Sequence, residues 1–247
     1  GLKNPAARSA ETLISVYSRQ VRQYSEIHRT DLCWFLYLTP KNTIMGLTLH
    51  YSARLRKPAR LPELVAEVED ICRSLDWKSH SFDETIEVPA AAVPLEPGEG
   101  DPKPIRLQGI FFTPTKCETA FLTFTPSGRT STPMNLEIAE DLAGITPEMV
   151  YSVHVKTQYA GLQTHVALVT LLKYLEKKYC YKMKVLDEGN FWKTLDQAVL
   201  KTRFNEYWSL INVVKEALEK EEWKVTDEPL KLALKMEEVI RRRLGEG

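Results

Sequence analysis

A proline-rich segment at residues 89–104 constrains the fold of this chain more than any other feature of its sequence. It contains five prolines. Proline fixes φ and lacks the backbone N–H that helices and sheets use, so this segment predicts a linker. The linker separates an N-terminal α+β half at 1–88 from a second α+β half at 105–190. The remaining residues, 191–247, predict a C-terminal helical hairpin packed on the sheet.

Hydrophobic periodicity places helices and strands on both sides of this linker. Apolar residues at helical spacing predict helices, and short alternating or aromatic-rich runs predict strands. Helices are predicted at 9–29, 61–75, 162–178 and 194–222, with a last one beginning near 226. Strands are predicted at 32–39, 45–52, 80–88, 106–113, 119–125, 133–138, 149–156 and 181–187. The predicted class is α+β, with mixed, mostly antiparallel sheets and helices packed on one face.

The two halves resemble each other in outline. Each opens with a predicted hairpin that carries a Thr-Pro pair at its turn, Thr39-Pro40 and Thr113-Pro114. Each then reaches a helix followed by a strand. This order suggests internal duplication of a ββαβ unit, with two ordinary α+β lobes as the alternative.

Charge and cysteine content narrow the functional class. The 33 basic and 33 acidic residues leave no net charge. Nucleic-acid binders usually carry a basic excess, so a nucleic-acid partner is unlikely unless basic residues gather on one face. The four cysteines are widely spaced and form no CxxC pair, which favours reduced core thiols over a metal site. We therefore expect a cytoplasmic protein with no membrane span, no metal and no cofactor.

The strongest candidate for a ligand site is the junction between the strand at 149–156 and the helix at 162–178. A helix N-terminus presents free N–H groups and the positive end of the helix dipole, which suit an anion. If the strand at 181–187 runs parallel in the same sheet, both strands end at the edge where α/β sheets bind ligands. A surface ion pair and a polar turn are the structural alternative. The predicted ligand-binding residues are His154, Lys156, Thr157, Gln158, His165, Asp187 and Glu188.

A basic loop is the second candidate. Arg54, Arg56, Lys57 and Arg60 lie close together in sequence and form a predicted basic patch. Such a patch suits phosphates or an acidic partner, whereas a solvated loop is the plain alternative. A nucleic-acid function would require other basic residues to gather on the same face.

Aromatic residues concentrate late in the chain, and interface cores are rich in aromatics. An exposed subset would indicate a protein partner or a homodimer. Common nucleotide, protease and hydrolase motifs are missing from the sequence, so enzymatic activity stays undecided. We therefore expect a non-enzymatic binding or protein-interaction domain, with an enzyme or binder of a small anionic or phosphate-bearing ligand at residues 154–165 as the alternative. The late aromatics are Phe191, Trp192, Phe204, Tyr207, Trp208 and Trp223.

Overall fold

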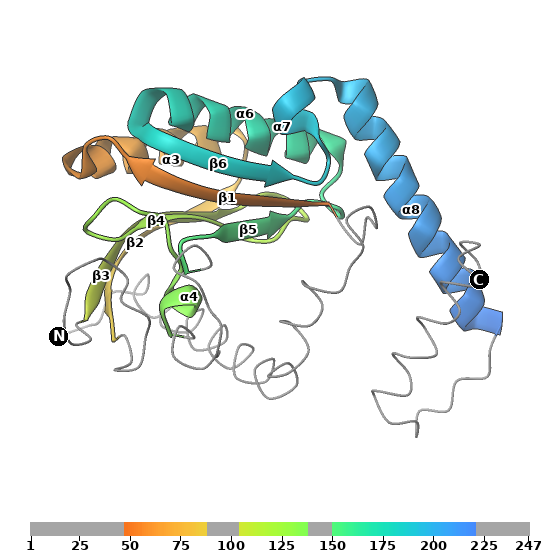
Figure 1. The fold of residues 1–247 in the computed structure, drawn as a ribbon, viewed down its shortest axis with the longest axis horizontal. Coiled ribbons are helices and arrows are strands. Elements are labelled where there is room, and N and C mark those ends of the chain that lie inside the picture. Colours follow the sequence, from red (N-terminus) through yellow and green to blue (C-terminus); the bar gives the residue numbers. More distant parts are fainter. Residues whose placement is uncertain (1–46, 88–103, 138–149, 221–247) are drawn as a thin grey trace. The chain divides into compact units, whose positions relative to one another are not determined.

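The computed structural model describes residues 47–87, 104–137 and 150–220, all within one compact unit at Ile44–Gly247 (Figure 1). Several predicted elements lie outside these residues. They are the helix at 9–29, the strand at 32–39, the linker up to residue 103 and the last helix. The domain boundaries predicted from them therefore stay predictions.

The strands of the described residues form two antiparallel sheets of three strands each. The first sheet has the order β5–β1–β6, at Val153–Lys156, Thr48–Leu55 and Cys180–Asp187. The second has the order β2–β3–β4, at Lys78–Ile86, Ile105–Thr113 and Ala120–Phe124. Both β5 and β6 are antiparallel to β1, so they run parallel to each other with β1 between them. The expected α+β class with antiparallel sheets is confirmed.

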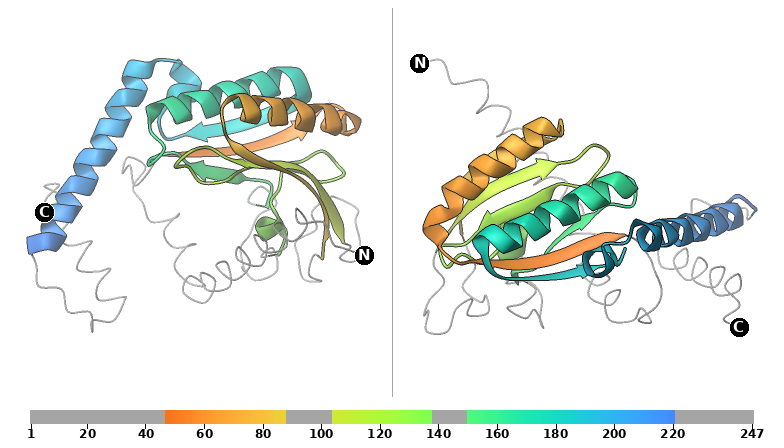
Figure 2. Two further views of the ribbon diagram at one scale, coloured as in Figure 1. Left: turned by 180° about the vertical axis from the view of Figure 1, so that it is seen from behind. Right: turned by 90° about the horizontal axis from the view of Figure 1, so that it is seen from above.

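Two helices lie on the same side of the sheets, α3 at Leu61–Ser74 and α6 at Leu162–Tyr179 (Figures 1 and 2). A one-turn 3-10 helix at Pro58–Arg60 leads into α3. Both sheets and both helices contribute to one hydrophobic core, and full burial of each large apolar side chain stabilises by roughly 1.5–3 kcal/mol. The core residues include Leu64 and Val68 of α3, Leu168 and Leu172 of α6, Leu49 and Tyr51 of β1, and Ile110, Phe112, Leu122 and Phe124 of β3 and β4.

The predicted strand at 133–138 is wrong, because this segment is the short helix α4 at Pro133–Glu137. The hydroxyl of Thr132 accepts a hydrogen bond from the backbone N–H of Asn135 at 3.1 Å. A threonine followed by proline is a good helix start, since the hydroxyl caps a free N–H and proline tolerates the first turn. That local signal outweighs the alternation of apolar and polar residues that is typical of a strand.

The helix predicted at 194–222 is found as α8 at Gln197–Lys220, so its predicted start was three residues too early. A short helix that the sequence did not predict, α7 at Phe191–Thr194, precedes it. Leu195 separates the two helices in the left-handed conformation, at φ 53°. The carboxylate of Asp196 then accepts the N–H of Ala198 at 2.7 Å and starts α8. The second helix of the predicted hairpin lies outside the described residues.

The connections through α3 and α6 differ. Helix α3 joins β1 to β2, which lie in different sheets, whereas α6 joins β5 to β6 within one sheet. The internal duplication stays a prediction. Among the helices of the described ranges, none is both long and apolar enough to span a membrane.

Candidate functional site

The sheet β5–β1–β6 has two chemically different faces, and strand alternation assigns each residue to one of them. Leu49, Tyr51 and Ala53 of β1 are buried in the core beneath the helices. His50 and Arg54 point to the opposite side and are at least partly exposed. We call this opposite side the open face.

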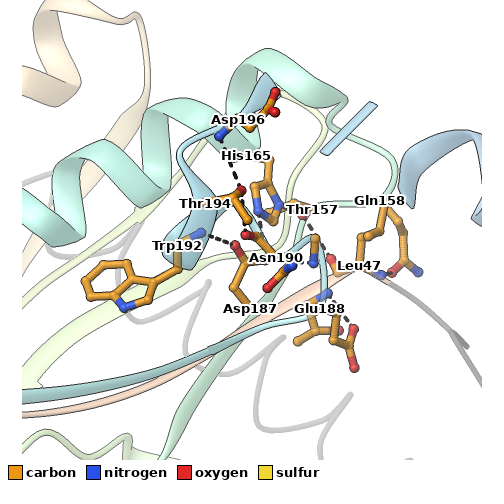
Figure 3. Close-up of polar contacts among 12 residues, drawn as sticks. Leu47, Thr157, Gln158, His165, Asp187, Glu188, Asn190, Trp192, Thr194 and Asp196 are labelled. Atoms are coloured by element: carbon orange, nitrogen blue, oxygen red, sulfur yellow. Dashed lines mark hydrogen bonds and ion pairs between the residues drawn. The ribbon is translucent and has the colours of Figure 1, made fainter. Parts of the chain in front are cut away.

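A histidine and an aspartate meet on the helix-covered face. His165 lies in the first turn of α6 and Asp187 ends β6, and their side chains are 0% and 2% exposed. The Nε2 atom of His165 is 3.0 Å from Oδ1 of Asp187, although the two atoms do not form a regular hydrogen bond (Figure 3). Both groups therefore face each other in a site closed off from water.

Thr157 completes this buried network from the end of β5. Its Oγ1 lies 2.7 Å from Nδ1 of His165 and donates a hydrogen bond to the carbonyl of Leu47 at 2.9 Å. A hydroxyl that donates to the carbonyl accepts from the imidazole, so Nδ1 carries a proton in this arrangement. The remaining nitrogen, Nε2, faces the Asp187 carboxylate.

The Asp187 carboxylate also organises the chain that follows β6. Oδ1 accepts the N–H of Gly189 at 2.7 Å, and Oδ2 accepts the N–H of Trp192 at 2.6 Å. Burial on its own would raise the pKa of Asp187, but His165 and these two N–H groups outweigh it and lower the pKa. The carboxylate thus stays ionised while it holds β6 to α7.

Gln158 has a similar structural role. Its side-chain carbonyl accepts the backbone N–H of Leu47 at 3.1 Å, and the residue is buried. Four of the predicted site residues, Thr157, Gln158, His165 and Asp187, are therefore engaged with one another or with the backbone that begins β1.

The open face carries a second histidine–carboxylate group. His50 of β1 lies directly opposite His154 of β5, with 6.1 Å between ring centroids. His50 Nε2 is 3.9 Å from Oε1 of Glu188, and Oε2 of Glu188 accepts the N–H of Thr48 at 2.7 Å. Partial burial and the neighbouring His50 lower the pKa of His154. Burial opposes ionisation of Glu188, but His50 and Thr48 lower its pKa overall.

Four exposed cations share this open face, and we call them the cationic face: Arg54, Lys156, Lys182 and Lys184. Arg54 lies directly opposite Lys182, and Lys184 is the next residue of β6 on the same side. Lys156 lies further along, opposite Thr48. Within the described ranges, these four side chains have no carboxylate within ion-pair distance. Glu118 is nearby, and its carboxylate accepts the backbone N–H of Lys156 at 3.0 Å.

The four residues of the predicted basic loop do not form one patch. Arg54 belongs to the cationic face, whereas Arg56 donates from Nε to the carbonyl of Cys180 at 2.6 Å. Arg60 pairs with Glu63 at 2.8 Å, and Lys57 is exposed. Only the first of the four loop residues lies among other cations of the described sheet.

The predicted junction site divides in the same way. His154, Lys156 and Glu188 are on or beside the open face, whereas Thr157, His165 and Asp187 meet on the helix-covered side. Gln158 is bonded to the backbone of Leu47. Sequence reasoning placed His154 and Lys156 on one face, as found. It missed His50, Lys182 and Lys184, although the two lysines lie two apart on a predicted strand and so had to share a face.

Most of the late aromatics within the described residues are buried or half-buried, and Trp208 is exposed. Phe191, Phe204 and Tyr207 are buried. Trp208 is 40% exposed, and its ring meets the edge of Tyr159, which is 63% exposed, at 6.0 Å between centroids. Trp192 is half-buried beneath the ammonium of Lys173, and Trp223 lies outside the described residues.

Neither a metal-binding group nor a known relative indicates a function for the described residues. Throughout the described part of the chain, no three His, Cys, Asp or Glu side chains are arranged to hold a metal ion. No family model, curated protein or solved structure matches the chain. The functional argument therefore depends on the geometry of the site.

Proposed function

We propose that this chain is a non-enzymatic binding domain whose cationic face binds an anionic partner. The observation that carries the proposal is the gathering of Arg54, Lys156, Lys182 and Lys184 on one sheet face of a chain with no net charge. Isolated unpaired lysines occur elsewhere, for example Lys193. Arg54, Lys182 and Lys184 are different, because they occupy neighbouring positions on two paired strands, where their fields add and attract an anion, and Lys156 extends the same face.

The arrangement of these cations costs the fold some stability. Arg54 and Lys182 are directly opposite each other, and like charges at such positions destabilise a sheet, by roughly 0.2–1 kcal/mol. Elsewhere the same chain pairs Arg106 with Asp83 at 2.7 Å across two neighbouring strands. An anion lying across Arg54 and Lys182 would relieve their repulsion, so binding and stability are linked at this position.

The histidine groups do not favour catalysis. His165 and Asp187 are closed to solvent, so a substrate does not reach them. His50 and Glu188 are accessible, but their 3.9 Å separation exceeds the roughly 2.6–3.2 Å of an aligned proton-transfer pair. These observations support a binding role over an acid–base role.

A small phosphate-bearing ligand is the narrower form of the same proposal. It would use the end of the open face where His154 and Lys156 lie, near the strand–helix junction.

The free thiols Cys72, Cys117 and Cys180 are compatible with the cytoplasmic location that we expect from the sequence.

A protein contact through Trp208 and Tyr159 is a second candidate function. Two aromatic rings exposed side by side are typical of interface anchors. If they mediate a homodimer, sedimentation velocity will show concentration-dependent dimers that Trp208→Ala abolishes. Monomers at every concentration would remove the homodimer.

The direct test of the main proposal is a titration with heparin, a polyanion that needs no specific recognition. The informative variant is K182E/K184E, and the matched control is K193E/K201E, which makes the same charge change at exposed positions of α7 and α8. We expect K182E/K184E to lose at least about tenfold in affinity at low salt while the control loses little. Equal losses in the two variants would show that only net charge matters and would overturn the proposal.

A further inference from the structure

We infer that the anionic partner of the cationic face is single-stranded nucleic acid, an inference that rests on the proposed function. The first observation is the length of the charged track. Lys156 is level with Thr48, and Lys182 is level with Arg54, six residues further along β1. At about 3.4 Å per residue this is roughly 20 Å, much longer than one phosphate group. The face therefore suits a chain with repeated negative charges.

The second observation is the presence of flat rings between the cations. The His50 and His154 rings lie between the Arg54–Lys182 row and Lys156, with 6.1 Å between centroids and 39° between planes. Imidazole rings are among the side chains on which unpaired bases stack. Neither a sulfated sugar nor an acidic peptide backbone offers a base for such stacking.

Exposed apolar groups extend the same pattern along β6. Leu186 lies directly opposite His50 and is 62% exposed. Tyr181 is 76% exposed and precedes Lys182, at the irregularity where β6 has one extra residue relative to β1. Cations that hold phosphates, interleaved with rings and apolar groups that contact bases, form the pattern of a sequence-tolerant single-strand site.

The shape of the face argues against duplex DNA. The cationic face is formed by the middle of three paired strands and its two neighbours, not by a projecting helix or two-stranded ribbon. Those projecting elements are what the major groove admits. Two carboxylates lie at the Lys156 end of the cationic face, Glu188 beside His50 and Glu118 beside Lys156. They weaken the positive potential there, so it is strongest at the other end, around Arg54, Lys182 and Lys184.

The test compares labelled oligothymidine with an abasic strand of the same length, by fluorescence anisotropy. We expect oligothymidine to bind at least about tenfold tighter, because base stacking adds to the phosphate contacts. Its log affinity should fall with log salt with a slope of about −3, from four phosphate contacts at roughly −0.7 each. K182E/K184E should weaken binding of both probes and make the slope shallower by about 1.4.

H50N/H154N separates stacking from charge. This variant removes both imidazoles and leaves the four cations in place, and urea unfolding checks that it folds. H50Q/H154Q is the substitute if it does not. We expect it to lower oligothymidine affinity about tenfold and abasic affinity little, with K193E/K201E as the control for both probes.

The outcomes separate this inference from the proposed function. If the abasic strand binds as tightly as oligothymidine, or polyglutamate binds tighter than both, the nucleic-acid inference is overturned while anion binding stands. If oligothymidine, abasic strand, polyglutamate and heparin all bind K182E/K184E as well as the unaltered chain, both are overturned.

Discussion

The two faces of the sheet β5–β1–β6 hold the same pair of residue types in opposite surroundings. On the helix-covered side, His165 and Asp187 are 3.0 Å apart and closed to water. On the open side, His50 and Glu188 are 3.9 Å apart and about one-third exposed. A buried carboxylate is costly to deprive of its partners, whereas an exposed pair contributes little. Burial therefore assigns the first pair to stability and leaves the second free to meet a ligand.

The end of β6 supplies the carboxylates of both histidine–carboxylate pairs. Asp187 and Glu188 are neighbours in sequence, so the period of two in a strand sends their side chains to opposite sides. Asp187 reaches the helix side, where His165 and the N–H groups of Gly189 and Trp192 surround it. Glu188 reaches His50 and the N–H of Thr48. Two adjacent carboxylates thus have unlike roles.

The largest expected effect comes from breaking the buried pair. Asp187→Ala removes the acceptor of the Gly189 and Trp192 N–H groups and the carboxylate that faces His165, and we expect it to cost about 3–5 kcal/mol in the free energy of unfolding. Glu188→Ala removes a part-exposed acceptor and should cost about 1 kcal/mol. Urea unfolding of both variants measures the contrast. Equal losses would mean that the two faces do not differ as described.

Overpacking beside His165 gives the next effect. A Cβ at Gly189 would lie 2.5 Å from Cδ1 of Leu200 and 3.0 Å from Nε2 of His165. Gly189→Ala should therefore destabilise the fold by about 1–3 kcal/mol. Repeating the substitution in a Leu200→Ala background removes the closest contact and should reduce the penalty. An undiminished penalty in that double-mutant cycle would show that the contact is not its cause.

At low pH, the Asp187 carboxylate should no longer contribute to the free energy of unfolding. The pKa of Asp187 is lowered in the fold, so its stabilisation is complete above the pKa of an unfolded aspartate, about 3.9. It is lost as pH falls through the lower native pKa. The stability difference between the unaltered chain and Asp187→Asn should be constant above about pH 5 and shrink below pH 4 in urea titrations. A difference that grows toward acid would contradict this assignment.

The smallest expected effect is a gain in stability, and it comes from a substitution on the open face. Lys182→Glu replaces a repulsion opposite Arg54 with an attraction, and we expect a gain of roughly 0.2–1 kcal/mol. Lys193→Glu on α7 is the control and should change stability little. Thermal and urea unfolding measure both. A loss in Lys182→Glu would show that Lys182 has a structural partner and is not held free for a ligand.

Local patterns predicted much of the secondary structure. The apolar stripe predicted α3, and the long apolar run predicted α6, within one residue of each end. The errors came where a single residue changed the backbone, at the Thr132 cap of α4 and at the left-handed Leu195. Those signals are short and compete with hydrophobic periodicity, so the longer pattern misled the prediction.

The site was harder to predict because it depends on pairing across distant strands. Spacing placed His154 and Lys156 on one side of a strand, and chain order placed Asp187 near His165. Neither shows that β1 lies between β5 and β6, which brings His50 beside His154 and Arg54 beside Lys182. Burial of His165 likewise follows from packing of α6 and α7, which no local pattern records.

The most direct test of the central claim is an amide chemical-shift titration of the ¹⁵N-labelled chain with polyphosphate. The account predicts that the largest shifts gather on β1 and β6 around Arg54, Lys182 and Lys184, and extend to Lys156. The amides around His165 should move little. Shifts scattered over lysines such as Lys193 and Lys201, or centred on the buried network, would contradict the assignment of binding to the open face.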